Sequence, residues 1–62
     1  MPTVSIEMFP GRTAEQKQAL VAGLTDAVVA ALDVPREKVR VKLYEIERYH
    51  SATGGRLDQP GH

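Results

Sequence analysis

The amino-terminal dipeptide Met1-Pro2 is the part of this sequence that points most directly to chemistry. Initiator methionine is usually removed when the next residue is small, and its removal would leave Pro2 with a free secondary amine. An α-amino group has a pKa of about 7.7 to 8.0, which desolvation or nearby cations lower further. Pro2 can therefore act as an unprotonated general base near neutral pH. The structural alternative is that Pro2 only begins a strand, where its missing N–H costs nothing.

Two arginines are candidate partners of such a base. Arg12 lies in a predicted turn and Arg40 near the start of a predicted strand. Arginine is permanently charged and binds carboxylates through a planar fork of N–H donors. Taken singly, each is also explained as a solvated surface charge. Together with Pro2 they suit proton abstraction beside the carbonyl group of a small acid, although spacing alone does not show that the three converge.

The elements that must position these residues begin with a strand. Apolar and polar residues alternate over residues 3–9 and place Val4, Ile6 and Met8 on one face of a half-buried strand. Phe9 falls on the opposite face, where it either lines a pocket between subunits or fills the interface.

A helix is predicted over residues 14–32. Thr13 and Gln16 have the spacing of a capping box, and Pro35 prevents much extension beyond Asp33. The apolar stripe expected to face the strands consists of Leu20, Leu24, Ala27, Val28 and Ala31. Further apolar residues fall outside that stripe, namely Val21, Ala22, Val29 and Ala30, so a monomer would expose apolar surface.

A second alternating segment, residues 39–46, predicts another strand. It places Val39, Val41 and Leu43 against the helix and Arg40, Lys42 and Tyr44 on the opposite face. A strand, a helix and a strand form a β-α-β unit with parallel strands, in an α+β fold whose sheet is covered on one face only. Residues 50–62 contain Gly54-Gly55 and few apolar side chains, which predicts a hairpin or arm that reaches a neighbouring subunit.

Length and composition narrow the functional classes. The 62 residues form a single domain, residues 1–62, with no cysteine and with only His50 and His62 as possible imidazole ligands. A domain this small needs a further source of stability, and oligomerisation is the one that remains. Because eight basic residues balance eight acidic ones without clustering, we expect neither nucleic acid nor a membrane as partner. The chain has no apolar run long enough to span a bilayer, and we expect a cytoplasmic protein.

The order and spacing of several motifs resemble those of the 4-oxalocrotonate tautomerase family over nearly the whole chain to about Gly55. The motifs are Pro2, the Gly11-Arg12-Thr13 turn, Leu32-Asp33 with Pro35, Val39-Arg40-Val41, and Gly54-Gly55. The resemblance implies a β-α-β protomer that assembles into a homohexamer, a trimer of dimers. It also implies a 2-hydroxymuconate-like tautomerase in which Pro2 shuttles a proton without metal or organic cofactor.

The same resemblance implies that Arg12 and Arg40 bind a small-molecule carboxylate substrate and stabilise the dienolate, and that Phe9 and Ser51 belong to the substrate site. Family members specific for 2-hydroxymuconate carry an aromatic residue where this chain has Ser51, and Tyr49 is displaced from that position. His50 is expected to be structural or exposed to solvent. The alternatives are a non-catalytic carboxylate-binding oligomer, or a hydratase or dehalogenase on the same scaffold. The dehalogenase is disfavoured because Ser51, Ala52 and Thr53 supply no carboxylate.

Overall fold

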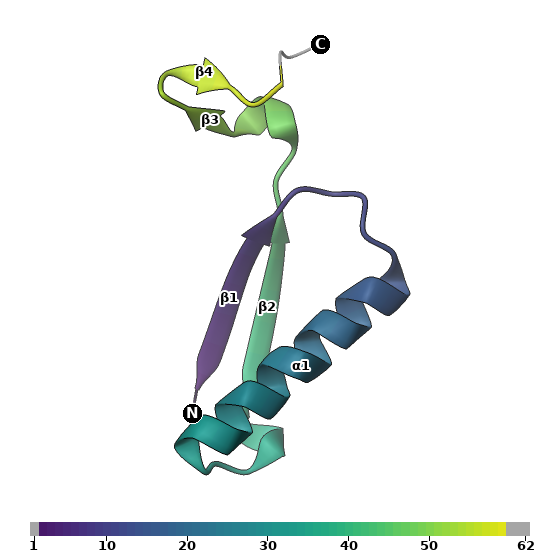
Figure 1. Ribbon diagram of the computed structural model, residues 1–62, viewed down its shortest axis with the longest axis vertical. Coiled ribbons are helices and arrows are strands. Elements are labelled where there is room, and N and C mark those ends of the chain that lie inside the picture. Colours follow the sequence, from purple (N-terminus) through teal and green to yellow (C-terminus); the bar gives the residue numbers. More distant parts are fainter. Residues whose placement is uncertain (1, 60–62) are drawn as a thin grey trace.

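A parallel strand pair and one helix form the body of the protein. The computed structural model describes residues 2–59, and Met1 and residues 60–62 lie outside the described residues. Strand β1 (Thr3–Met8), helix α1 (Ala14–Leu32) and strand β2 (Arg40–Glu45) form a β-α-β unit, with a 3₁₀ turn η1 (Arg36–Lys38) before β2. Strands β1 and β2 are parallel, and the helix crosses one face of the pair (Figure 1). The predicted fold class is confirmed, including the carboxyl-terminal hairpin described below.

Local chemistry explains where α1 begins and ends. The Thr13 hydroxyl accepts a hydrogen bond from the Gln16 N–H, and the Gln16 side chain accepts one from the Thr13 N–H, each at 3.0 Å. This capping box satisfies backbone donors that the first helical turn leaves unpaired. At the other end Asp33 adopts a left-handed conformation, with φ 53° and ψ 52°. Pro35 then follows, so the helix cannot continue.

The face that α1 turns toward the sheet differs from the predicted stripe. Ala27 and Ala31, expected against the strands, are exposed, whereas Val21 and Val29, expected outside the stripe, are half-buried. Leu20, Leu24 and Val28 are half-buried as predicted. The helix is rotated so that Val21 and Val29 rather than Ala27 and Ala31 are half-buried, because the larger side chains remove more apolar area from water.

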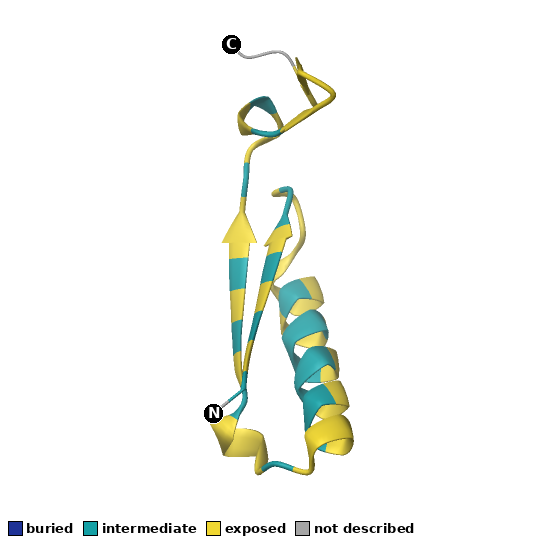
Figure 2. Ribbon diagram, turned by 90° about the vertical axis from the view of Figure 1, so that its left-hand side faces the viewer, coloured by how far each residue is buried: buried dark blue, intermediate teal, exposed yellow. Residues whose placement is uncertain are grey.

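The chain has no interior of its own. Within residues 2–59 no residue is buried, and the apolar residues between helix and sheet are only half-buried (Figure 2). The radius of gyration is 14.9 Å, against about 11 Å for a compact domain of this length. The accessible surface is 4,873 Å², against roughly 4,000 Å² for a folded monomer of this mass. The chain therefore has the surface of a subunit rather than of an independent globule.

Beyond β2 a short arm extends away from the body. It consists of the 3₁₀ turn η2 (Arg48–His50) and the hairpin of β3 (Ala52–Thr53) and β4 (Arg56–Leu57). Gly54 and Gly55 both have positive φ, 60° and 81°, as a two-residue hairpin turn requires. Figure 1 shows the hairpin past the carboxyl-terminal ends of the strands, clear of the helix. Residues 60–62 of the predicted arm lie outside the described residues. No helix in residues 2–59 has the length and apolarity needed to cross a membrane.

Candidate active site

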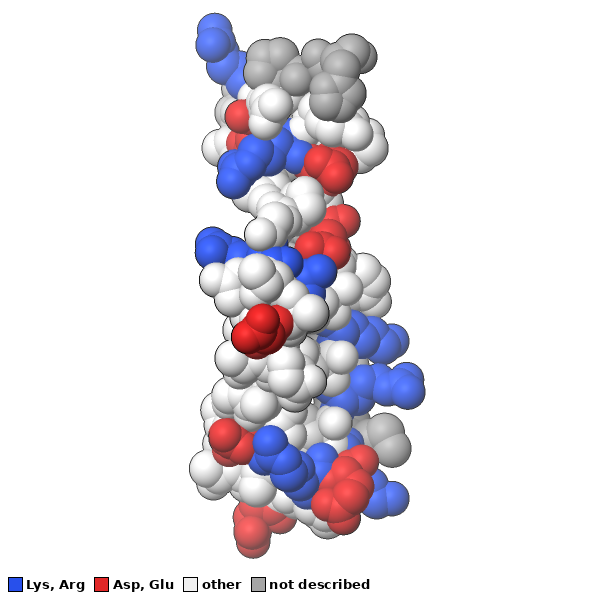
Figure 3. Space-filling view, turned by 90° about the vertical axis from the view of Figure 1, so that its right-hand side faces the viewer, with Lys and Arg blue, Asp and Glu red and all other residues white. Residues whose placement is uncertain are grey.

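Two of the predicted site residues are neighbours at the amino-terminal end of the sheet. The Arg40 backbone N–H donates a hydrogen bond to the Pro2 carbonyl oxygen at 3.0 Å. Pro2 is half-buried just before β1, and Arg40 is exposed on the face of β2 that the helix does not cover. Arg40 is followed on the same face by Lys42, and Lys and Arg side chains project from that side of the molecule (Figure 3). This end of the sheet therefore combines the candidate base with positive charge.

The other predicted site residues lie at the opposite end of the sheet. Phe9 follows β1 directly, Arg12 lies in the loop between β1 and α1, and Ser51 caps η2 beyond β2. Since a strand advances about 3.3 Å per residue, β1 separates Pro2 from Phe9 by roughly 20 Å. Within one chain the structure brings Pro2 to Arg40 but does not bring either of them to Arg12, Phe9 or Ser51.

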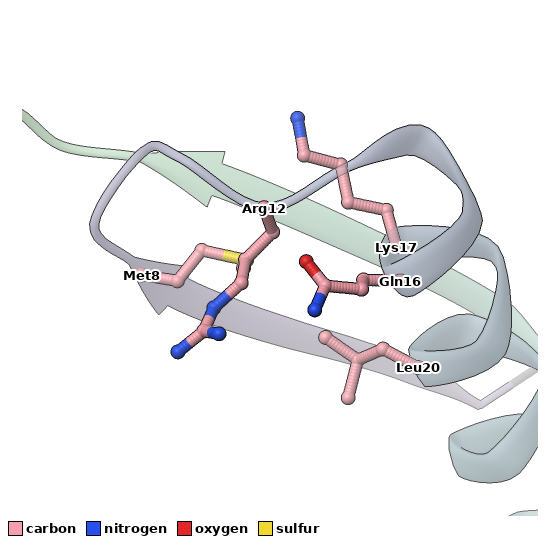
Figure 4. Close-up of a pocket in the computed structure, with 5 residues that line it drawn as sticks. All are labelled: Met8, Arg12, Gln16, Lys17 and Leu20. Atoms are coloured by element: carbon pink, nitrogen blue, oxygen red, sulfur yellow. The ribbon is translucent and has the colours of Figure 1, made fainter.

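Arg12 borders an open pocket between β1 and the start of α1. The pocket has a volume of about 230 Å³ and is lined by Met8, Arg12, Gln16, Lys17 and Leu20. Met8 reaches in from the strand and Gln16 and Leu20 from the helix, while the Arg12 guanidinium lies at the rim beside Met8 (Figure 4). Lys17 is bound to Glu45 of β2, with 2.9 Å between Nζ and Oε2. An arginine beside apolar Met8 and Leu20 suits a carboxylate on a hydrocarbon chain.

A cation–aromatic contact links β1 to the arm. The guanidinium carbon of Arg48 lies 4.0 Å from the centre of the Phe9 ring. The Ser51 N–H donates to the Arg48 carbonyl at 3.2 Å, and the Ser51 carbonyl accepts from the Asp58 N–H at 2.7 Å. His50 is exposed, in agreement with the sequence-based expectation, and its ring contacts Tyr49 edge-on at 4.5 Å. Phe9, Arg48 and Ser51 thus form one group around η2.

Two features of this end were missed from the sequence. The pocket was missed although Gln16 and Leu20 have the four-residue spacing of one helix face, a signal that was available. The pairing of Phe9 with Arg48 gave no such signal, because it joins residues far apart in the chain and depends on how η2 turns back toward β1.

Comparison with known proteins places the chain in a family. A family model described as tautomerase enzyme matches residues 2–57. A probable tautomerase of Ralstonia nicotianae is 44% identical over 55 residues, which cover 89% of this chain and 79% of the relative. A 2-hydroxymuconate tautomerase of a Pseudomonas species is 38% identical over 55 residues, covering 89% of this chain and 87% of that protein.

Solved structures agree with the sequence relatives. The crystal structure of a 4-oxalocrotonate tautomerase homologue superposes with a TM-score of 0.89 at 37% identity, covering 100% of this chain and 98% of the other. A heterohexameric 4-oxalocrotonate tautomerase from Chloroflexus aurantiacus superposes with a TM-score of 0.87 at 38% identity, covering 94% of each chain. The resemblance inferred from the motifs is confirmed: the chain belongs to the tautomerase family and is an isomerase of the tautomerase class.

Proposed function

We propose that the protein is a cofactor-independent tautomerase that catalyses keto–enol proton transfer in a small unsaturated 2-oxo or 2-hydroxy acid resembling 2-hydroxymuconate. Pro2, freed by removal of Met1, is the general base, and Arg12 and Arg40 bind the carboxylate and stabilise the developing oxyanion. The observation that carries the proposal is the division of these residues between the two ends of an unfinished sheet. Such a division is expected if residues from two or more copies of the chain together form one active site.

The backbone of β1 has an outer edge through which two copies of the chain can pair. The Pro2 carbonyl accepts a hydrogen bond from Arg40 of β2, and the Met8 carbonyl accepts one from Ile46, the residue directly after β2. Because successive peptide groups point to opposite sides of a strand, the even-numbered residues of β1 face β2. The N–H and C=O groups of Thr3, Ser5 and Glu7 consequently face the outer edge, where a second strand can pair with them.

Antiparallel pairing of two β1 strands about a two-fold axis brings the amino end of each strand to the carboxyl end of the other. Pro2 of one copy then lies beside the Phe9–Arg12 segment of the second, which supplies the carboxylate-binding arginine. The pairing extends the two-stranded sheet to four strands. Three such dimers form a homohexamer, in keeping with the hexameric assembly of the Chloroflexus aurantiacus relative. The projecting β3–β4 hairpin and the half-buried apolar residues supply surface for these contacts.

The chemistry follows from these groups. The unprotonated Pro2 nitrogen accepts the proton of the enol hydroxyl at position 2 and delivers a proton to a carbon of the same conjugated system, so the reaction consumes no other reagent. Negative charge collects on the oxygen at position 2 as the proton leaves. An arginine held near that oxygen stabilises the dienolate without reorganising.

The test is the ultraviolet-monitored ketonisation of 2-hydroxymuconate and phenylenolpyruvate. Protein whose mass confirms the free Pro2 terminus is compared with the Pro2→Ala variant, which keeps the strand but replaces the secondary amine. We expect turnover in the first and a loss of at least about a hundred-fold in the second, the usual contribution of a general base. Equal rates in both proteins would refute the role of Pro2, and background rates with both substrates would refute the proposed substrate class.

A further inference from the structure

We infer that Lys17 and Glu45 are positioning residues for Arg12, because their ion pair fixes the backbone from which Arg12 reaches the substrate. The inference rests on the proposed function, since it concerns an arginine to which that proposal assigns carboxylate binding. It starts from the ion pair between α1 and β2, which closes off the loop that carries Arg12.

The loop between β1 and α1 is held at its ends. Residues 9–12 lie outside any helix or strand and make no backbone hydrogen bond within residues 2–59. Gly11, inside the loop, has a φ of 120°, a conformation that glycine adopts far more readily than other residues. The Arg12 guanidinium has no carboxylate partner in the described part of the chain, where the ion pairs join other residues. The position of Arg12 is therefore set by the anchors at the two ends of the loop.

Both anchors lead to the same point on the sheet, the end of β2. At the first end of the loop, the Met8 carbonyl accepts a hydrogen bond from the Ile46 N–H at 2.8 Å. At the second end, the Thr13 carbonyl accepts one from the Lys17 N–H at 3.0 Å. The Lys17 Nζ in turn lies 2.9 Å from the Glu45 Oε2. Because Glu45 and Ile46 are adjacent, the ion pair completes a ring of contacts around the loop.

The ion pair also fixes where the start of α1 lies along β2. Within residues 2–59 no other hydrogen bond or ion pair joins these two elements. The remaining contacts between helix and sheet are apolar and half-buried, and apolar attraction has no preferred direction. The side chains of Lys17 and Glu45 are only 33% and 37% exposed, so water and salt screen their attraction less than that of a fully exposed pair.

Lys17 acts on Arg12 through the backbone and not by direct contact. Both residues line the pocket, but the Lys17 ammonium and the Arg12 guanidinium point away from each other (Figure 4). When the ion pair is broken, the first turn of α1 is free to shift and carries Thr13 and Arg12 with it. A displacement of about 1 Å in a substrate-binding group is enough to cost a large factor in catalytic efficiency.

The test measures KM and kcat of Lys17→Met and Glu45→Gln, which remove one charge each and keep the length of the side chain. The substrate is whichever of 2-hydroxymuconate and phenylenolpyruvate the wild-type protein turns over faster. We expect KM to rise about three- to ten-fold in each variant, less than for complete loss of a hydrogen bond to a charged group. We expect kcat to change little. The exchanged pair, Lys17→Glu with Glu45→Lys, should recover most of the wild-type KM.

Two controls separate positioning from stability. In an Arg12→Gln background, Lys17→Met should change KM by less than about two-fold, because two residues that act through one contact are not additive. Arg36→Gln breaks the other ion pair of α1, with Asp26, which ties the helix to η1 and not to β2. Arg36→Gln should leave KM unchanged. Urea denaturation of every variant shows whether a change in KM follows a change in stability.

Amide hydrogen exchange supplies a readout that does not depend on turnover. The amides of Gly11, Arg12 and Thr13 should exchange faster in Lys17→Met and in Glu45→Gln than in wild type, because local opening of the loop then costs less free energy. Arg36→Gln should leave the exchange of these amides unchanged.

The inference is overturned if Lys17→Met and Glu45→Gln both keep the wild-type KM. It is also overturned if Lys17→Met raises KM by the same factor with and without Arg12, which would mean a structural effect unrelated to that arginine. Failure of the proposed function is a different result, in which wild-type protein with a free Pro2 terminus turns over neither substrate above background. Unchanged amide exchange in Lys17→Met and Glu45→Gln would then by itself refute the positioning role.

Discussion

Replacing Ser5 by proline tests whether the outer edge of β1 joins two copies of the chain. Ser5 is exposed at the middle of β1, and alternation from the Pro2 and Met8 carbonyls directs its N–H away from β2. Proline has no N–H, but on an edge whose donor faces outward it leaves the ladder to the inner strand intact. The Ser5→Pro variant should therefore keep the β1–β2 pair and weaken only the contact with a second copy.

The expected loss of dimer stability in Ser5→Pro follows from the two-fold symmetry of the proposed interface. A two-fold axis uses each edge group twice, so one proline per chain removes the Ser5 donor from both sides of the interface. At about 0.5 to 1.5 kcal/mol for each hydrogen bond, the loss is about 1 to 3 kcal/mol per dimer. The dissociation constant of the dimer should rise roughly 5- to 150-fold.

The assay is sedimentation equilibrium over a wide range of protein concentrations, with tautomerase activity measured at each concentration. We expect the Ser5→Pro variant to dissociate at higher concentration than wild type and to lose activity in the same range. Ser5→Ala, which keeps the N–H, is the matched control and should behave as wild type. Circular dichroism at high concentration verifies that the variant still folds. If Ser5→Pro retains wild-type assembly and activity, pairing through the β1 edge is wrong.

Two further predictions concern the ends of α1. Thr13→Ala removes the hydroxyl of the capping box and should lower the free energy of unfolding by about 1 kcal/mol per chain, measured by urea denaturation at fixed protein concentration; an unchanged midpoint would mean that the cap contributes nothing. Asp33→Asn keeps a side chain that tolerates the left-handed conformation but removes a negative charge from the carboxyl end of the helix, so it should stabilise the protein by about 0.3 to 1 kcal/mol at low ionic strength. That gain should shrink as salt is added, and a salt-independent gain would point to the backbone instead.

Local signals in the sequence were sufficient for much of the fold. The Thr13 and Gln16 spacing predicted the helix start because a capping box involves only neighbouring residues. The alternation of Val4, Ile6 and Met8 predicted β1 for a similar reason. The prediction of which face of α1 is covered was wrong by part of a turn. Ala27 and Val29 both fit an apolar stripe, and only packing against the strands decides between them.

The candidate site was less accessible to sequence reasoning. Motif spacing indicated Pro2, Arg12 and Arg40 as candidate site residues, but no spacing along a chain reports that β1 holds Pro2 and Arg12 at opposite ends of a sheet. The contact between Phe9 and Arg48 lay beyond prediction for the same reason, because it depends on the turn at η2. Residues that meet only through tertiary structure or through a second copy leave no periodic pattern in the sequence.

Mixing two inactive variants most directly tests the claim that two copies of the chain share one active site. Pro2→Ala lacks the proposed base and Arg12→Ala lacks a proposed carboxylate-binding residue, so each variant alone should be nearly inactive. If Pro2 and Arg12 of one site belong to different chains, unfolding and refolding an equal mixture should restore activity to about a quarter of the wild-type value, the fraction of sites that receive both intact residues. If each site lies within one chain, no mixed assembly contains an intact site, and the mixture will stay as inactive as its components.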